Sequence, residues 1–224
     1  ENFTIENIRG NRKEPGLKNQ HMECVKAAKR LCDAKVDGME KRSEKLVFKS
    51  GKFRNESIKS DIGTAGSTTL LLDTVLPITT QFNEIFSIRA KGGTDVKWSP
   101  SSLYYKHVKL PLLEELGLEA IVEIKRTGFY PEGDGEIFLE TESYSMEEFE
   151  IVKRGGLEKL EVYSKASKDL KSSNVAERQA AEAVKKLNKS FKSTEIEKNT
   201  EYVEASSKGS AILIKAVYED SVAG

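Results

Sequence analysis

A short basic loop near the N-terminus carries Arg9, Arg12 and Lys13 between a strand-like run and a helix-like run. Guanidinium groups bind phosphate oxygens through forked, charge-assisted hydrogen bonds. Gln20 falls in the first turn of the expected helix, where a side-chain amide and backbone N–H groups can also face an anion. The spacing therefore indicates a phosphate site, and a solvated basic loop is the commoner alternative.

A glycine- and hydroxyl-rich loop, Gly63-Thr64-Ala65-Gly66-Ser67-Thr68, opens a second helix-like run. Backbone N–H groups in such a loop can cradle a phosphate. The loop lacks the lysine of a P-loop and does not match the dinucleotide-binding fingerprint. Glycines that merely allow a tight strand-to-helix turn are the alternative interpretation.

Histidine and metal chemistry have few candidates in this sequence. His21 and His107 are the only histidines, and each falls within an expected helix, which favours a packed or surface role. No cluster of His, Cys and Asp has the spacing of zinc ligands, and no serine elbow is present. We therefore expect either binding that needs no metal or Mg²⁺ carried by phosphates.

Hydrophobic periodicity predicts the elements that would position these groups. Apolar residues at three- and four-residue steps between His21 and Cys32 are typical of one buried helical face, and residues 70–78 predict a largely buried helix. The alternation of helices and strands predicts helices packed on sheets. The other expected elements are strands at 3–8, 46–48, 85–90, 120–125 and 136–139, a helix at 104–116, and a hairpin turn at Ser50-Gly51.

An acidic, polar stretch at 140–150 divides the chain. We place the boundary between a large domain, 1–146, and a small domain, 147–224. In the small domain, Asn174 with Glu177 predicts a helix N-cap with a reciprocal partner. Strands expected at 157–163, 194–197 and 211–218 complete a small α/β unit with its own core.

Composition limits the classes of protein. The 224 residues suffice for one large domain or two modest ones, and 38% hydrophobic with 32% charged residues excludes a disordered or collagen-like chain. Lys+Arg (36) and Asp+Glu (36) cancel, so a polyanion must be met by a local basic cluster.

The compartment is predicted from two further features. Cys24 and Cys32 would lie about 12 Å apart along one helix, too far to bridge, which favours a reducing, cytoplasmic location. No apolar run is long enough to span a bilayer.

The sequence starts at Glu1 inside a strand-like run and stops just after another, so we expect segments to be missing at both ends.

Five blocks of the chain together resemble a known family. They are Ile8-Arg9-Gly10-Asn11-Arg12 with Pro15-Gly16-Leu17 and Gln20-His21; Asp61-Ile62-Gly63-Thr64-Ala65-Gly66-Ser67; Gly92-Gly93-Thr94-Asp95-Val96 through Pro100 and Tyr104 to Pro111; Gly128-Phe129-Tyr130-Pro131-Glu132-Gly133-Asp134-Gly135; and Asn174-Val175-Ala176-Glu177-Arg178-Gln179 with Ser206-Ser207-Lys208-Gly209-Ser210. In this order, over nearly the whole chain, they resemble the RNA 3′-terminal phosphate cyclases.

The resemblance implies an α+β fold of repeated βαβαββ-type units, as in the enolpyruvyl transferases, with a smaller α/β insert. It implies an enzyme that uses ATP and a divalent metal such as Mg²⁺ to convert an RNA 3′-phosphate to a 2′,3′-cyclic phosphate. The route implied runs through an enzyme-histidine adenylate and an RNA-pyrophosphoryl-adenosine end. The partner implied is an RNA 3′ end, and a homodimer is compatible with the family. The resemblance implies no association with a membrane.

Carried over residue by residue, the resemblance implies that Arg9, Arg12 and Gln20 bind phosphates of ATP or of the RNA end. Pro100 and Tyr104 would lie against the adenine, with core packing as an equal alternative. Asp73 stands where the family usually has a glutamine near the nucleotide.

The sequence also departs from the family pattern. The adenylated histidine has no counterpart here, since neither His21 nor His107 fills its place, and the family's glycine-rich N-terminal segment is not found. Leu103 replaces a usual Asp, Thr127 a usual Arg or His, and Asp134 the middle of three glycines. The rival functions are a cyclase-like ribosome-assembly or RNA-processing factor that does not cyclise ends, and another transferase on the same fold.

Overall fold

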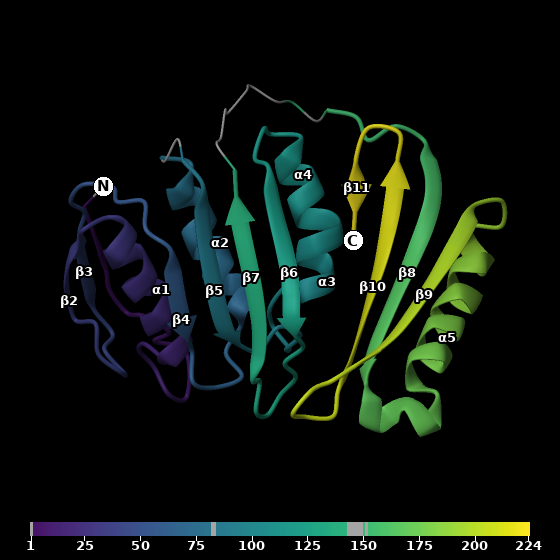
Figure 1. Ribbon diagram of the computed structural model, residues 1–224, viewed down its shortest axis with the longest axis horizontal. Coiled ribbons are helices and arrows are strands. Elements are labelled where there is room, and N and C mark those ends of the chain that lie inside the picture. The colour runs from purple at the N-terminus through teal and green to yellow at the C-terminus, as the bar shows by residue number, and fades with distance from the viewer. Residues whose placement is uncertain (1, 82–83, 143–149, 151) are drawn as a thin grey trace.

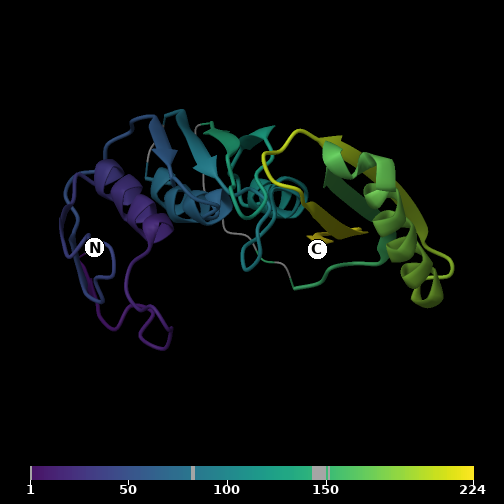
Figure 2. The same cartoon turned by 90° about the horizontal axis from the view of Figure 1, so that it is seen from below.

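A four-stranded sheet forms the centre of the computed structural model, which describes residues 2–81, 84–142, 150 and 152–224. Its strand order is β4-β5-β7-β6, with β4 parallel to β5 and the other neighbours antiparallel. The helices lie on one face of this sheet (Figures 1 and 2). The bounds are β4 (Ile58–Asp61), β5 (Phe86–Gly92), β6 (Ala120–Arg126), β7 (Gly135–Thr141), α1 (Asn19–Leu31), α2 (Thr68–Thr79), and one helical segment made of α3 (Ser102–Tyr104), η1 (Tyr105–Lys109) and α4 (Leu110–Glu114).

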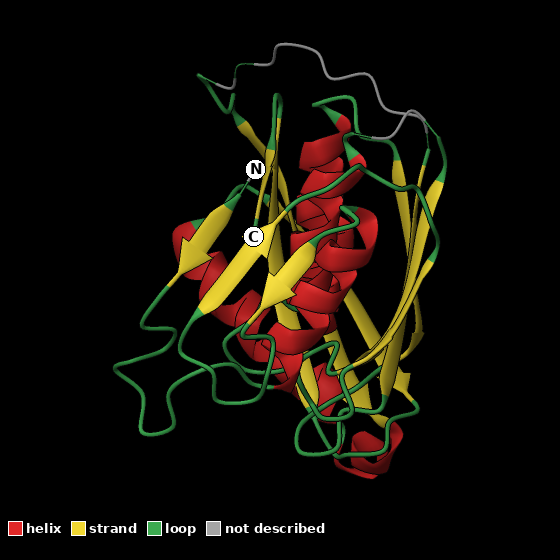
Figure 3. Cartoon of the chain, turned by 90° about the vertical axis from the view of Figure 1, so that its left-hand side faces the viewer, coloured by secondary structure: helices red, strands yellow, loops and turns green. Residues whose placement is uncertain are grey.

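The main apolar core lies between α2 and the sheet. Ser67 caps α2, because its side chain accepts a hydrogen bond from the Leu70 backbone N–H. Leu71, Leu72 and Val75 are completely buried, as the apolar run predicts. They pack against residues from β5 and β7 such as Ile88 and Leu139. Figure 3 shows the helices stacked beside the strands.

A three-stranded sheet of order β1-β3-β2 stands at the N-terminal side. The hairpin predicted to turn at Ser50-Gly51 is wrong, because β3 pairs with β1 and β2, and the Gly51 N–H bonds to the Cys32 carbonyl. The partner strand β2 is short and polar, so no apolar pattern in the sequence predicted it. The bounds are β1 (Phe3–Ile5), β2 (Lys35–Asp37) and β3 (Leu46–Lys49).

A second four-stranded sheet, of order β11-β10-β8-β9, carries helix α5 at the far end of the molecule (Figure 1). Its middle strand β8 is buried along most of its length, and α5 packs on β8 and β9. The bounds are β8 (Leu157–Ser167), η2 (Lys168–Ser173), α5 (Val175–Ser190), β9 (Glu195–Val203), β10 (Ser210–Tyr218) and β11 (Val222–Ala223).

The cap predicted at the start of α5 differs from the one formed. Asn174 makes no side-chain cap hydrogen bond, and its backbone is left-handed at φ 48°. Instead, the Tyr202 hydroxyl accepts from the Ala176 N–H at 3.2 Å and donates to Glu177 at 2.5 Å. A tyrosine from β9 therefore replaces the local cap, because tertiary structure brings its hydroxyl to the helix N-terminus.

The architecture is mixed α/β, which confirms the α+β class; the repeated units stay a prediction. The predicted boundary between residues 146 and 147 lies outside the described residues. The central sheet precedes this boundary and the second four-stranded sheet follows it. The helical segment beside the central sheet contacts the second sheet through a small apolar cluster of Leu103, Val108 and Leu213. Within the described ranges, no helix is both long enough and apolar enough to cross a membrane.

Candidate nucleotide and phosphate site

Loops from distant parts of the chain gather at one end of the molecule, the lower end in Figure 1. Three of them follow β4, β5 and β6, and backbone hydrogen bonds tie them together. Gly93 N–H donates to the Gly66 carbonyl at 2.7 Å, and Thr94 N–H donates to the Gly128 carbonyl at 2.9 Å. The glycine-rich loop after β4 is therefore held against the loop after β5.

The basic loop at 8–17 is organised by Arg9. Its Nη1 donates to the carbonyl oxygens of Glu14 and Gly16, both at 2.8 Å. Gly16 has a φ of +77°, and an added Cβ would lie 2.2 Å from the Arg42 carbonyl oxygen, so the position requires glycine. One nitrogen of the Arg9 guanidinium thus shapes the loop. Arg12 is exposed on the same loop.

Gln20 connects α1 to the start of α2. Its Oε1 accepts from the Ser67 backbone N–H at 2.8 Å. Ser67 Oγ lies 2.8 Å from Thr69 Oγ1, which in turn donates to the Pro100 carbonyl at 2.8 Å. A continuous line of hydrogen bonds therefore joins two predicted site residues, Gln20 and Pro100, that stand far apart in the sequence.

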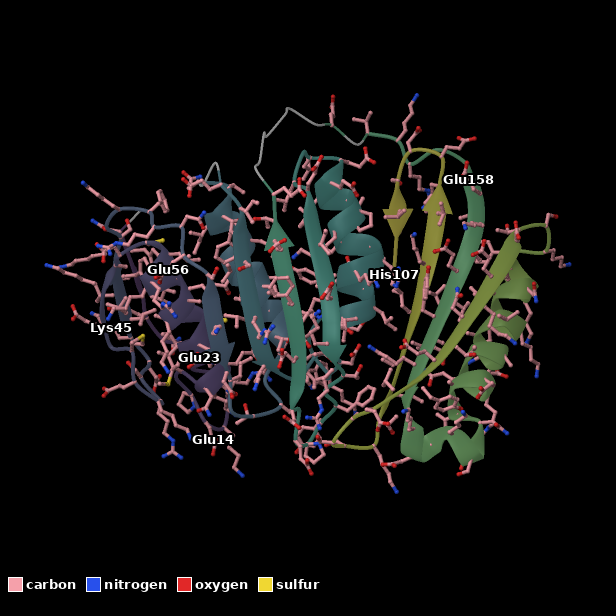
Figure 4. The ribbon with its side chains drawn as sticks, viewed as in Figure 1. Glu14, Glu23, Lys45, Glu56, His107 and Glu158 are labelled. Carbon is pink, nitrogen blue, oxygen red and sulfur yellow. The ribbon has the colours of Figure 1, made fainter. Side chains whose placement is uncertain are left out.

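A cavity of about 340 Å³ opens between α1 and the glycine-rich loop. Its lining includes three cations, Lys18, Lys41 and Arg42. It also includes the carboxylate of Glu14, which is labelled in Figure 4. None of these three cations is among the site residues predicted from the sequence. The adjacent basic pair Lys41-Arg42 was the available signal, but only the fold brings it opposite Gln20.

His21 belongs to the same cavity lining and has a structural role there. Its Nδ1 accepts from the Lys18 backbone N–H at 3.0 Å, at the N-terminus of α1. Burial, followed by the charges of Arg9 and Lys18, lowers the pKa of His21. The imidazole is therefore neutral at pH 7, and lysine and arginine supply the positive charge that an anion would meet.

The other predicted nucleotide contacts lie beside α2 and the helical segment. Asp73 forms an ion pair with Lys109. Burial, followed by the Asp73 charge, raises the pKa of Tyr105. Tyr104 packs against the apolar cluster between the two sheets. Asp73, Pro100 and Tyr104 are not among the described residues that line the cavity, and their contact with adenine stays a prediction.

Each of the three residues that replace a usual family residue is buried or ion-paired in the structure. Leu103 is buried in the cluster between the sheets, and Thr127 is 3% exposed. Asp134 adopts a φ of 49° and forms an ion pair with Arg126 at 2.9 Å. Among the residues that the structure describes, no group of three or more His, Cys, Asp or Glu side chains could hold a metal ion.

Comparison with known proteins adds independent findings. The family model for RNA 3′-terminal phosphate cyclase matches residues 1–219. The RNA 3′-terminal phosphate cyclase of Halobacterium salinarum is 37% identical over 235 residues, which cover 100% of this chain and 67% of that protein. Proteins of the same name from Saccharolobus islandicus and Saccharolobus solfataricus are 39% and 38% identical over 223 residues, covering 99% of the chain and 65% of each relative. The chain thus spans about two thirds of these relatives' length.

Proposed function

Because the chain belongs to the RNA 3′-terminal phosphate cyclase family, a family of enzymes, we propose that the protein uses ATP to convert RNA 3′-phosphates to 2′,3′-cyclic phosphates. The reaction proceeds through an adenylate on a histidine and then an RNA-pyrophosphoryl-adenosine end. A phosphate monoester reacts poorly with a hydroxyl, whereas the anhydride provides AMP as a leaving group. The neighbouring 2′-oxygen then attacks, favoured by its proximity.

One observation supports this function more than any other. A line of hydrogen bonds from Gln20 through Ser67 and Thr69 to the Pro100 carbonyl supports the proposal, because it connects one predicted phosphate ligand with one predicted adenine contact. The start of α2 lies within that line, and a helix N-terminus favours anions.

We assign phosphate binding to the cavity beside Gln20, with Lys18, Lys41 and Arg42 as further cations. Arg12 extends from the same basic loop, and Arg9 both shapes that loop and offers the rest of its guanidinium. A divalent cation such as Mg²⁺ would enter bound to the nucleotide's phosphates, since carboxylate-poor sites hold Mg²⁺ through phosphates and water. A homodimer and a cytoplasmic location stay predictions.

The test is adenylation of the complete protein by ATP labelled in the α-phosphate. We expect acid-labile AMP on a histidine, and conversion of a 3′-phosphorylated oligoribonucleotide to an end that resists phosphatase. Absence of both signals would contradict the proposal and favour the assembly factor. Turnover of a phosphorylated small molecule, with RNA ends unchanged, would favour the other transferase.

The Arg12→Ala variant tests the phosphate site. We expect adenylation to fall at least about tenfold, because the variant loses a charge-assisted contact with phosphate. Because Arg12 is exposed, the unfolding free energy should change little. Arg54→Ala is the matched control, because Arg54 forms an exposed ion pair with Asp33 away from the cavity. Equal adenylation by both variants would remove Arg12 from the site.

A further inference from the structure

Two aromatic side chains stand in solvent on the loops that adjoin the candidate site. Trp98 is 97% exposed and Tyr130 is 74% exposed. Their loops are bound to each other, because Asp95 N–H donates to the Gly128 carbonyl at 3.1 Å and Gly128 N–H donates to Thr94 Oγ1 at 3.0 Å. Single exposed hydrophobic residues need no explanation, but here two large exposed rings occur on loops that are bound to each other.

The backbone at Trp98 is held in an unfavourable conformation. Its φ of 69° lies in the left-handed region, where a bulky residue is strained. Hydrogen bonds fix the loop on both sides: Ser99 Oγ donates to the Val96 carbonyl at 3.0 Å, and Thr69 Oγ1 donates to the Pro100 carbonyl at 2.8 Å. The fold therefore fixes a strained backbone there, and the ring gains no burial in return.

Each ring has an exposed lysine on its own loop or on a loop in contact with it. Lys97 is exposed next to Trp98, and Lys208 is exposed on the loop at 204–209. That loop contacts the Tyr130 loop, because Glu132 N–H donates to Ser207 Oγ at 3.1 Å and an added Cβ on Gly209 would meet the Phe129 ring at 2.3 Å. The Tyr130 loop carries two carboxylates: Glu132, and Asp134, which Arg126 neutralises.

A second cavity, of about 450 Å³, begins at the residues that lead into the Tyr130 loop. It lies between β6 and the second sheet, and Arg126 and Thr127 line it. Five cations line it against two carboxylates, Glu201 and Glu204. The five cations are Lys106, Lys125, Arg126, Lys165 and Lys168. Four of them are ion-paired, Lys125 with Glu123, Arg126 with Asp134, Lys165 with Asp95 and Lys168 with Glu204, so this cavity adds no excess of positive charge.

We propose that Trp98 and Tyr130 are base-stacking platforms for the single-stranded RNA that precedes the reacting 3′ end. Exposed rings on loops with exposed lysines fit unpaired bases joined by phosphates, because every base has a stacking face and the phosphates can meet Lys97 and Lys208. A duplex presents no free base faces to such rings. This inference rests on the proposed function and extends it to the path of the RNA.

The experiment uses an unstructured oligouridylate, labelled at its 5′ end, and the complete protein. Trp98 is the one tryptophan of this sequence, so the emission difference between the wild type and Trp98→Phe isolates its signal. We expect the oligouridylate to quench that emission. Trp98→Ala should raise the Kd about tenfold, measured by anisotropy. Trp98→Phe, which keeps a ring, should stay within about threefold of the wild type.

Ile85→Ala is the matched control, since Ile85 is 65% exposed but precedes β5, at the strand end opposite Trp98. If Trp98→Ala binds as tightly as the wild type while ends are still cyclised, the stacking proposal is wrong and the cyclase function stands. Unchanged Trp98 emission on RNA binding would likewise overturn it and favour a protein partner for this surface. Failure of the wild type both to bind RNA and to cyclise ends would overturn both proposals.

Discussion

The core beneath the central sheet and the interface between the two sheets are built from different chemistry. The core is apolar, with Leu72 and Ile88 completely buried. The interface has a small apolar cluster and a buried ion pair, in which Lys165 Nζ lies 2.9 Å from Asp95 Oδ2. His107 also stacks on Tyr163 across it, with ring centroids 4.1 Å apart (Figure 4 labels His107).

The difference shows what each region can tolerate. An apolar core loses stability in proportion to the volume removed, because packing is non-directional. A buried ion pair depends on a few directed contacts; Lys165 also donates to Ser102 Oγ, and Ser102 donates to Asp95. The interface therefore helps to orient the segment that follows Pro100, in addition to Tyr105 and Leu110, which that segment contributes to the core.

Removal of the buried charge should have the largest effect. Lys165→Met leaves Asp95 buried and unpaired, so we expect a loss of about 3–5 kcal/mol in the free energy of unfolding, measured with urea. A loss below about 1 kcal/mol would mean that water reaches Asp95 in the folded protein, and the contrast between the two regions would then be wrong.

Truncation in the core should rank second. Leu72→Ala creates a cavity beneath the sheet and should cost about 3 kcal/mol in the same measurement. Leu72→Met keeps the volume and should cost less than about 1.5 kcal/mol. Equal losses in the two variants would show that shape rather than volume limits this core.

Acid should weaken the interface by a smaller amount. Burial, followed by Lys106 and Lys215, lowers the pKa of His107 from 6.5. The unfolded chain then binds more protons below pH 6.5, so stability is present above that pH and falls as pH decreases through the folded pKa. His107→Phe, which keeps a ring on Tyr163, should reduce the slope of urea midpoint against pH. An unaltered slope would contradict a contribution of His107 to this pH dependence.

The smallest effect is expected at the surface. Arg54 and Asp33 form an ion pair at 2.7 Å, but their side chains are 63% and 52% exposed. Arg54→Met should change the unfolding free energy by less than about 1 kcal/mol. A change as large as that of Lys165→Met would show that burial does not separate the two pairs.

Local patterns predicted much of the fold and part of the candidate site. The apolar run at 70–78 predicted buried α2, and residues 85–90 predicted β5. The short strand β2, with one apolar residue, gave no pattern. In the site, types and spacing singled out Arg9, Arg12 and Gln20, whereas Lys41 and Arg42 gave only a weak signal.

The sequence by itself determined the elements with strong periodicity, because burial of one face imposes a spacing on apolar residues. It also determined the family, through ordered blocks that need no coordinates. Only the tertiary structure decided which polar groups meet. Lys165 and Asp95 are 70 positions apart, and Tyr202 caps a helix that begins 27 positions before it. Such contacts depend on how the sheets pack, which no local pattern encodes.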